Sequence, residues 1–229
     1  MQWLFNSSIG RKLIMSISGL FLVLFLVFHL CMNIAAVFSE EAYNMICALL
    51  GSNWYAVALT MVLAGGFFVH IVYALILTLQ NRKARGNEAY AVNVRPKNVG
   101  WASKNMFVLG LIVIGFLLLH GSQFWYKMMF QELMGHHEVA LGNGMVSPQD
   151  GAAFIRYYFS QLWIVVAYLG WYVALWFHLT HGFWSALHTI GWNSKIWFNR
   201  WKCISNIFAT VVCLGYAIVT IAFYVKSLL

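Results

Sequence analysis

Five long apolar runs alternate with short polar segments along the chain. They extend over about residues 13–38, 54–79, 105–126, 162–187 and 203–225. A helix needs about 20 apolar residues to cross the hydrocarbon core of a bilayer, and each run is long enough. A spanning segment must satisfy its own backbone hydrogen bonds, and no run shows the alternation of a barrel strand. The pattern predicts an all-α fold: a bundle of five transmembrane helices that forms a single domain over residues 1–229.

The composition excludes a soluble enzyme. Apolar residues make up 62% of the chain and charged residues only 9%, against about 25% charged in a typical soluble domain. The four cysteines are Cys31, Cys47, Cys203 and Cys213, and no pair has the Cys-x-x-Cys spacing. This spacing argues against a cysteine-ligated iron–sulfur cluster and against covalently attached haem on this chain.

The charges predict how the bundle is oriented. The net charge is +8, but the basic residues lie in short segments between apolar runs, which indicates topology signals and anionic-lipid contacts rather than nucleic-acid binding. By the positive-inside rule, the N-terminus is then cytoplasmic and the C-terminus outside, in the cell inner (cytoplasmic) membrane. Eleven of the 14 basic residues fall on the predicted inner side: Arg11, Lys12, Arg82, Lys83, Arg85, Arg95, Lys97, Lys104, Lys195, Arg200 and Lys202.

Each of the first four runs carries a histidine in its apolar interior. These are His29, His70, His120 and His178. One intramembrane histidine can be explained by a hydrogen bond to a neighbouring helix. Four on successive helices favour a functional role, because ionisable groups are costly inside a bilayer.

The depths of these histidines predict two pairs. An α-helix rises 1.5 Å per residue, so His29 lies about 24 Å and His120 about 22 Å from the inner edge of the core. His70 and His178 are as far along their runs, but these two helices enter from outside. We therefore expect His29 and His120 to share a level near the outer face, and His70 and His178 a level near the inner face.

Two histidines that face each other, twice, suit two b-type haems. Neutral imidazole binds iron without adding charge to the membrane, and two axial imidazoles favour electron transfer over oxygen chemistry. His181 competes with His178, because it lies three residues further along the same run and faces a similar direction. His181 is also a candidate partner for a haem propionate.

The arrangement resembles a known family. Ser16-Ile-Ser-Gly19-Leu-Phe precedes His29, and His178-Leu-Thr-His-Gly182-Phe-Trp184-Ser lies in the fourth run. With one histidine on each of four helices, the whole chain resembles the five-helix, single-anchor, di-haem cytochrome b subunit of succinate:quinone oxidoreductases and quinol:fumarate reductases. The resemblance implies that His29 and His120 ligate the iron of a distal haem, and that His70 and His178 ligate a proximal one.

The resemblance also implies cofactors, partners and activity. The cofactors would be two haem b, with a quinone, menaquinone, as substrate. The partners would be a flavoprotein subunit with FAD and an iron–sulfur subunit, both on the cytoplasmic face. The chain would be the quinone-reactive membrane subunit of succinate dehydrogenase or fumarate reductase, in the tricarboxylic acid cycle or anaerobic respiration, and would have no dicarboxylate site itself. Candidate propionate partners near the inner surface are Ser16, Lys104, His181 and Lys195.

Two other readings compete with this one. A di-haem cytochrome b anchor of a hydrogenase or formate dehydrogenase often has two ligands on one helix, unlike this chain. A transporter with histidine relays usually shows repeats and broken helices, which are not visible here. The chain also departs from one branch of the family, which has glutamate two residues before the fourth ligand, where Trp176 stands here. The carboxylates closest to the expected distal haem are Glu40 and Glu41.

Overall fold

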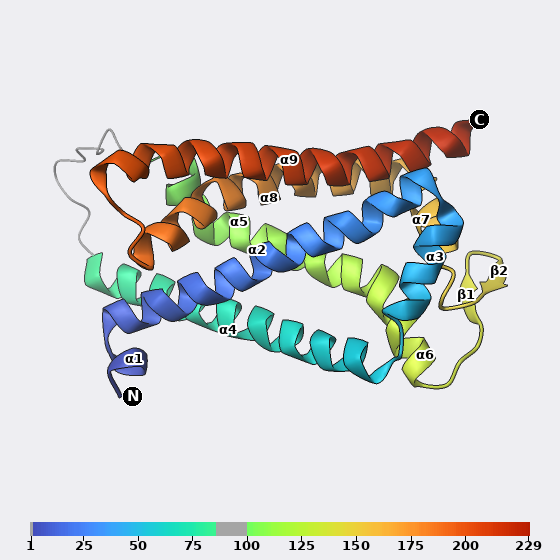
Figure 1. The fold of residues 1–229 in the computed structure, drawn as a ribbon, viewed down its shortest axis with the longest axis horizontal. Coiled ribbons are helices and arrows are strands. Elements are labelled where there is room, and N and C mark those ends of the chain that lie inside the picture. Colours follow the sequence, from blue (N-terminus) through green and yellow to red (C-terminus); the bar gives the residue numbers. More distant parts are fainter. Residues whose placement is uncertain (1, 86–99) are drawn as a thin grey trace.

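The structure, a computed structural model, is mostly helical and describes residues 2–85 and 100–229. Arg95 and Lys97, which contribute to the predicted orientation, lie outside the described residues. Figure 1 shows the elements in order along the chain. They are α1 (Gln2–Asn6), α2 (Ser8–Phe38), α3 (Glu40–Leu49), α4 (Trp54–Arg85), α5 (Trp101–His120), the π-helix η1 (Gly121–Phe130), α6 (Gln131–Leu133), β1 (Val139–Leu141), β2 (Gly144–Val146), α7 (Gly151–Phe159), α8 (Leu162–Thr189) and α9 (Lys195–Leu228).

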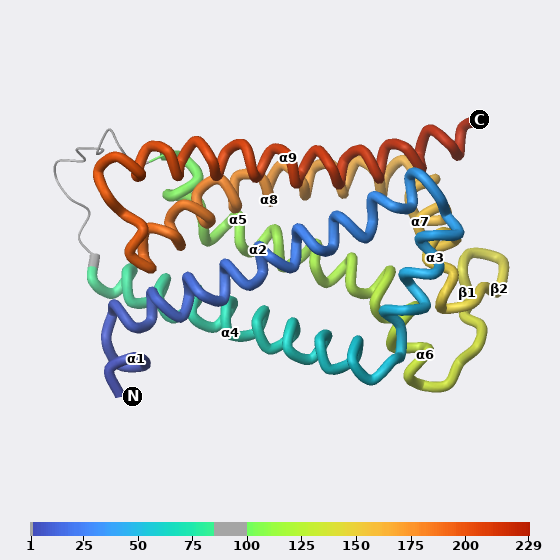
Figure 2. The backbone as a smooth tube through the Cα atoms, in the orientation of Figure 1, coloured from blue at the N-terminus to red at the C-terminus, as the bar shows by residue number. Residues whose placement is uncertain are grey.

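Five helices are long and apolar enough to cross a membrane: α2, α4, the continuous α5–η1–α6 helix, α8 and α9. The predicted all-α fold is confirmed, and the chain is a multi-pass membrane protein. The two termini lie at opposite ends of the bundle (Figure 2). We call the end with the N-terminus the basic end, because most of the described basic residues lie there, and the opposite end, with α3 and the β-hairpin, the cap end.

The apolar runs underestimated the helices at the basic end: α2, α4, α5 and α9 all extend further there than predicted, and serine caps account for α2 and α9. α2 begins five residues before the predicted start, because the Ser7 side chain accepts a hydrogen bond from the Gly10 N–H (2.9 Å). α9 begins at Lys195 rather than at 203, because Ser194 accepts from the Trp197 N–H (3.3 Å). Serine caps supply acceptors for free N–H groups at a helix start, so polar first turns can precede the apolar run. Lys195, Arg200 and Lys202 therefore lie on α9, not in a loop.

The third predicted helix, 105–126, changes its winding within its length. It is α-helical only to His120 and continues as the π-helix η1. The Ser122 hydroxyl donates to the Leu119 carbonyl (2.7 Å), the acceptor that the Gln123 N–H would use in an α-helix. A side chain that takes part in the i to i−4 ladder is a known cause of such a change. π segments often occur at functional sites.

α3, the β-hairpin and α7 close the cap end (Figure 1), and hydrogen bonds tie α3 to the start of α7. Asn44 on α3 donates to Asp150 Oδ1 (2.8 Å) and accepts from the Ala152 N–H (2.9 Å). The Ser52 hydroxyl donates to Glu132 Oε1 (2.9 Å), which joins the segment after α3 to α6. These segments are too short to form an apolar run of membrane-spanning length, which is why the apolar pattern did not indicate α3 or the hairpin.

The tightest part of the core lies between α8 and α9, where Tyr168, Ile164 and Phe223 are almost fully buried. α2 packs against α4, α8 and α9, and α5 packs against α8. In the described ranges, α2 does not pack closely on α5, nor α4 on α8. Gly66 allows α2 and α4 to approach, because a Cβ there would lie 2.6 Å from the Phe21 ring. Small residues commonly let membrane helices approach in this way.

Candidate functional site

The structure brings the four intramembrane histidines together in two pairs. The ring centroids of His29 on α2 and His120 on α5 are 5.8 Å apart. Those of His70 on α4 and His178 on α8 are 6.4 Å apart. We call His29 and His120 the cap-side pair, and His70 and His178 the basic-side pair. This grouping agrees with the depth arithmetic, whereas the role of these residues as iron ligands stays a prediction.

Each pair joins two helices that do not pack closely on one another. The cap-side pair bridges α2 and α5, and the basic-side pair bridges α4 and α8. The histidine side chains therefore provide a contact between helices that otherwise have few. A group held between the two rings of a pair would lie in the interior, between helices, rather than on the outside of one helix.

The two pairs occupy separate levels of the bundle. On α2, Ser18 lies next to His70 and precedes His29 by 11 residues, a rise of about 16 Å. On α8, Tyr168 lies next to His120 and precedes His178 by 10 residues, a rise of about 15 Å. Two helices thus give the same separation independently.

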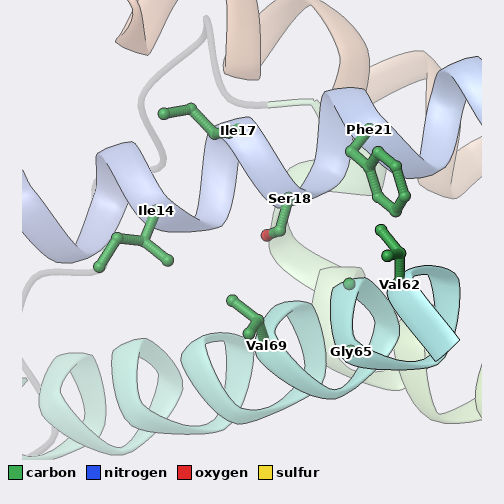
Figure 3. A pocket seen from close by; sticks show the side chains of 8 residues that line it. Ile14, Ile17, Ser18, Phe21, Val62, Gly65 and Val69 are labelled. Carbon is green, nitrogen blue, oxygen red and sulfur yellow. The ribbon is translucent and has the colours of Figure 1, made fainter. Parts of the chain in front are cut away.

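One member of the basic-side pair, His70, lies beside an apolar groove. Ser18 Oγ is 3.3 Å from His70 Nδ1. A groove of about 370 Å³ between α2 and α4 is lined by Ser18 and by apolar residues that include Phe21 and Val69. Figure 3 shows the Ser18 hydroxyl on the side of α2 that faces α4. Across the bundle, His178 Nδ1 is buried and has no hydrogen-bond partner among the described residues.

Aromatic and amide groups surround the cap-side pair. Phe25 stacks on His29 with centroids 5.3 Å apart, and the Asn33 side-chain amide lies 3.3 Å from His29 Nε2. His120 Nδ1 is 3.3 Å from the Tyr168 hydroxyl, which donates to Gln123 Oε1 (2.6 Å).

Trp171 also lies beside the cap-side pair. Its ring centroid is 6.1 Å from that of His120, and its indole N–H is buried without a partner in the described structure. A buried donor without a partner is costly unless a bound group satisfies it.

The residues present fit a haem iron at each level. Two imidazoles that hold one metal ion in trans, each through a nitrogen about 2 Å away, have ring centroids about 6 Å apart. Residues 2–85 and 100–229 contain no group of three or more His, Cys, Asp or Glu side chains that could hold a metal ion. A metal held by only two imidazoles takes its other ligands from water or from a cofactor, and a porphyrin provides them without water in an apolar interior. The partnerless His178 Nδ1 and Trp171 N–H are consistent with this fit.

The four candidate propionate partners lie at the basic end on three different helices, α2, α5 and α8, and at the start of α9. Ser16 is buried on α2, whereas Lys104 and Lys195 are exposed at the starts of α5 and α9. His181 lies edge-on to Trp184 (5.1 Å), and Lys202 Nζ lies 5.0 Å from the same Trp184 ring. Among the hydrogen bonds and ion pairs of the described residues, none joins two of the four candidates.

Two other positions have defined partners. The Trp176 indole donates to Thr210 Oγ1 (2.9 Å) and so ties α8 to α9, where one branch of the resembled family has a carboxylate. Glu40 forms an ion pair with Arg156, and Lys226 Nζ lies 3.9 Å from its other oxygen. Glu41 is exposed.

Sequence reasoning missed the polar side chains around the histidines. Ser18, Asn33 and Tyr168 each lie against a histidine, and Gln123 accepts a hydrogen bond from Tyr168. Asn33 and Gln123 carried a usable signal, because a polar amide near an intramembrane histidine is unusual. Ser18 and Tyr168 carried no such signal. The sequence alone does not distinguish Ser18 from Ser16, and tyrosines are common in this chain.

A comparison of the chain with protein-family models, with curated proteins and with solved structures finds no match.

Proposed function

We propose that this protein is the membrane anchor and cytochrome b subunit of a succinate dehydrogenase or fumarate reductase. In this proposal the His29–His120 pair holds one b-type haem and the His70–His178 pair holds another. The observation that carries the proposal is the presence of two facing histidine pairs, each from two different helices, at levels about 15 Å apart.

The histidine pairs suit this task because they are neutral ligands in a largely apolar interior. The rings of the cap-side pair lie among Phe25, Phe124 and Trp171, and His70 lies beside the apolar groove between α2 and α4. Such surroundings exclude water and keep a bound group at a fixed depth. With two histidines holding each iron, the haems would supply electron transfer rather than oxygen chemistry.

When bound, the two haems would supply one-electron transfer along the bilayer normal, between an iron–sulfur subunit at one face and menaquinone in the membrane. The basic end would face the cytoplasm by the positive-inside rule. Its positive charge suits an acidic docking face of that subunit. The flavoprotein with FAD and the dicarboxylate site would lie beyond the iron–sulfur subunit. The membrane would then be the cell inner membrane.

The basic end also offers partners for the propionates of the basic-side haem. His181, Ser16, Lys104 and Lys195 all lie at this end of the bundle. Lys202, which lies over the Trp184 and Phe198 rings (5.0 and 4.2 Å), is a further cation in the same region.

The direct test is the haem content of the protein purified from its native membrane. Pyridine haemochrome analysis should give two b-type haems per 26.1 kDa chain, and the reduced protein should show sharp α and β bands. FAD and iron–sulfur subunits should purify with it. A haem-free protein would overturn the proposal, as would a single haem or haem c. A haem-containing protein that purifies with hydrogenase or formate dehydrogenase subunits would leave the haem sites standing but refute the named enzyme.

A further inference from the structure

We infer that one histidine of each pair is fixed as its Nδ1–H tautomer by a hydroxyl group whose own proton is committed elsewhere: His120 by Tyr168, and His70 by Ser18. The inference rests on the proposed function, because its purpose is to leave Nε2 free for iron. It makes Tyr168 and Ser18 positioning residues.

The Tyr168 hydroxyl has a single proton, and the structure shows where that proton goes. Its oxygen lies 2.6 Å from Gln123 Oε1, which is an acceptor, so Tyr168 donates there. The contact with His120 Nδ1 (3.3 Å) must then run the other way, with the imidazole donating to the hydroxyl oxygen. A neutral imidazole with a proton on Nδ1 has a bare lone pair on Nε2.

The reverse orientation of the Gln123 amide would give the opposite result. Its NH₂ group would donate to Tyr168, the Tyr168 proton would turn to His120 Nδ1, and the ring would carry its proton on Nε2. That tautomer could not bind iron through Nε2. Tyr168 is 2% exposed and Gln123 6%, so water does not compete for either group. The amide orientation therefore decides whether His120 is ready to bind a metal.

Ser18 repeats this arrangement at the other level. The Ser18 hydroxyl donates its proton to the Met15 carbonyl (3.0 Å). Its oxygen therefore accepts a hydrogen bond from His70 Nδ1–H (3.3 Å). The two hydroxyls come from different helices, α8 for Tyr168 and α2 for Ser18. The other member of the basic-side pair, His178, has a buried Nδ1 without a partner in the described structure. Each level thus has one ring oriented by a hydroxyl of a neighbouring helix.

This contact has a consequence that packing alone would not produce. A metal-bound histidine that donates its second N–H is a more basic ligand, and such outer partners typically change metal affinity about 10–100-fold. A more basic ligand stabilises the ferric state and lowers the reduction potential. Loss of the acceptor should therefore raise the midpoint potential of one haem and leave the other unchanged.

The test is a redox titration of four variants of the full chain, purified with its accompanying subunits, together with EPR spectra of the ferric haems. The variants are Tyr168→Phe, Ser18→Ala, Gln123→Leu and Tyr172→Phe. Tyr172→Phe is the matched control: Tyr172 lies one turn further along α8 and is also buried, but its hydroxyl pairs with Thr220 (2.9 Å). Loss of one haem in His29→Ala and of the other in His70→Ala assigns each signal to its level.

Tyr168→Phe should raise only the cap-side potential, or release only that haem, and Ser18→Ala should do the same at the basic side. Gln123→Leu should act on the cap-side haem, because it frees the Tyr168 proton to compete for His120 Nδ1. Tyr172→Phe should change neither signal. If Tyr168→Phe and Ser18→Ala keep both haems at unchanged potentials, this inference is overturned while the proposed function stands. Equal shifts in Tyr168→Phe and Tyr172→Phe would overturn it in the same way. A haem-free wild-type chain would overturn the proposed function and this inference with it.

Discussion

Gly19 on α2 lies directly against the ring of His70 on α4: a Cβ atom at position 19 would be 3.2 Å from His70 Cε1. This distance is shorter than most Cβ contacts, so a larger residue would require the ring to move. Position 19 and the hydroxyl of Ser18 together define where the His70 imidazole lies. The Ser-Ile-Ser-Gly segment of the sequence therefore fixes a side chain on another helix.

Gly19→Ala should displace the His70 ring by a few tenths of an ångström and weaken haem binding at the basic-side pair by about tenfold. The measurement is the amount of each haem that remains after dilution into detergent. Gly170→Ala on α8 is the control, since a Cβ there meets nothing within 4 Å and both changes raise helix propensity equally. Equal haem retention in the two variants would contradict the expected contact.

Alanine variants of the four histidines should fall into two spectral classes. His29→Ala and His120→Ala should lose the same haem, and His70→Ala and His178→Ala the other, because each pair shares one ring-to-ring contact. Low-temperature spectra of the reduced protein would show which component disappears. The exposed His188 provides the control variant, His188→Ala, which should keep both haems. If His178→Ala kept both while His181→Ala lost one, the α8 ligand would be His181.

The stability of the cap end should depend more on the hydrogen bonds of Asn44 than on the ion pair between Arg156 and Glu40. Asn44→Ala removes two hydrogen bonds that join α3 to the start of α7 and leaves the Ala152 N–H without its acceptor, at a cost of about 1–3 kcal/mol, whereas Asp150 Oδ1 still accepts from the Ala153 N–H (3.0 Å). Arg156→Gln removes the ion pair with Glu40. The Arg156 side chain is 51% exposed and the Glu40 side chain 33%, so the loss should cost less than about 1 kcal/mol. Thermal unfolding in one detergent would rank the two variants, and the reverse order would refute this account of the cap.

Cys47, on α3 outside the spans, should react slowly with thiol reagents at neutral pH. Burial raises the pKa of its thiol from 9.0 to about 11. Since the thiolate is the nucleophile, a raised pKa means less reactive species at any pH below it. In a variant with Cys47 as its sole cysteine, the alkylation rate should rise with a midpoint near pH 11, and near pH 9 after denaturation. A native midpoint at or below 9 would show that the thiol is not buried against Tyr43 and Gly151.

The sequence could predict the five spans and the grouping of the histidines because both depend on distances along a helix. Rise per residue converts the positions of His29 and His120 into depth without knowledge of packing. The rotation of each helix about its axis could not be predicted in this way, because packing against the other helices sets it. Ser16 and Ser18 lie on different faces of α2, and only the position of α4 decides that Ser18 meets His70. Tyr168 and Gln123 became a linked pair only through the contact of α8 with the π segment, which local sequence does not specify.

The basic-side pair also bears on how the protein assembles. In the most apolar 18-residue segment of α4, no residue is buried by the rest of the chain, whereas 44% of the corresponding segment of α9 is buried. Through its histidine, α4 meets α8 across the bundle. A metal ion shared by His70 and His178 would add a bond between these two helices, so that cofactor insertion and the docking of α4 become one thermodynamic event. Supply of the cofactor to a cell would then control how much of this protein matures and how much is left for proteolysis.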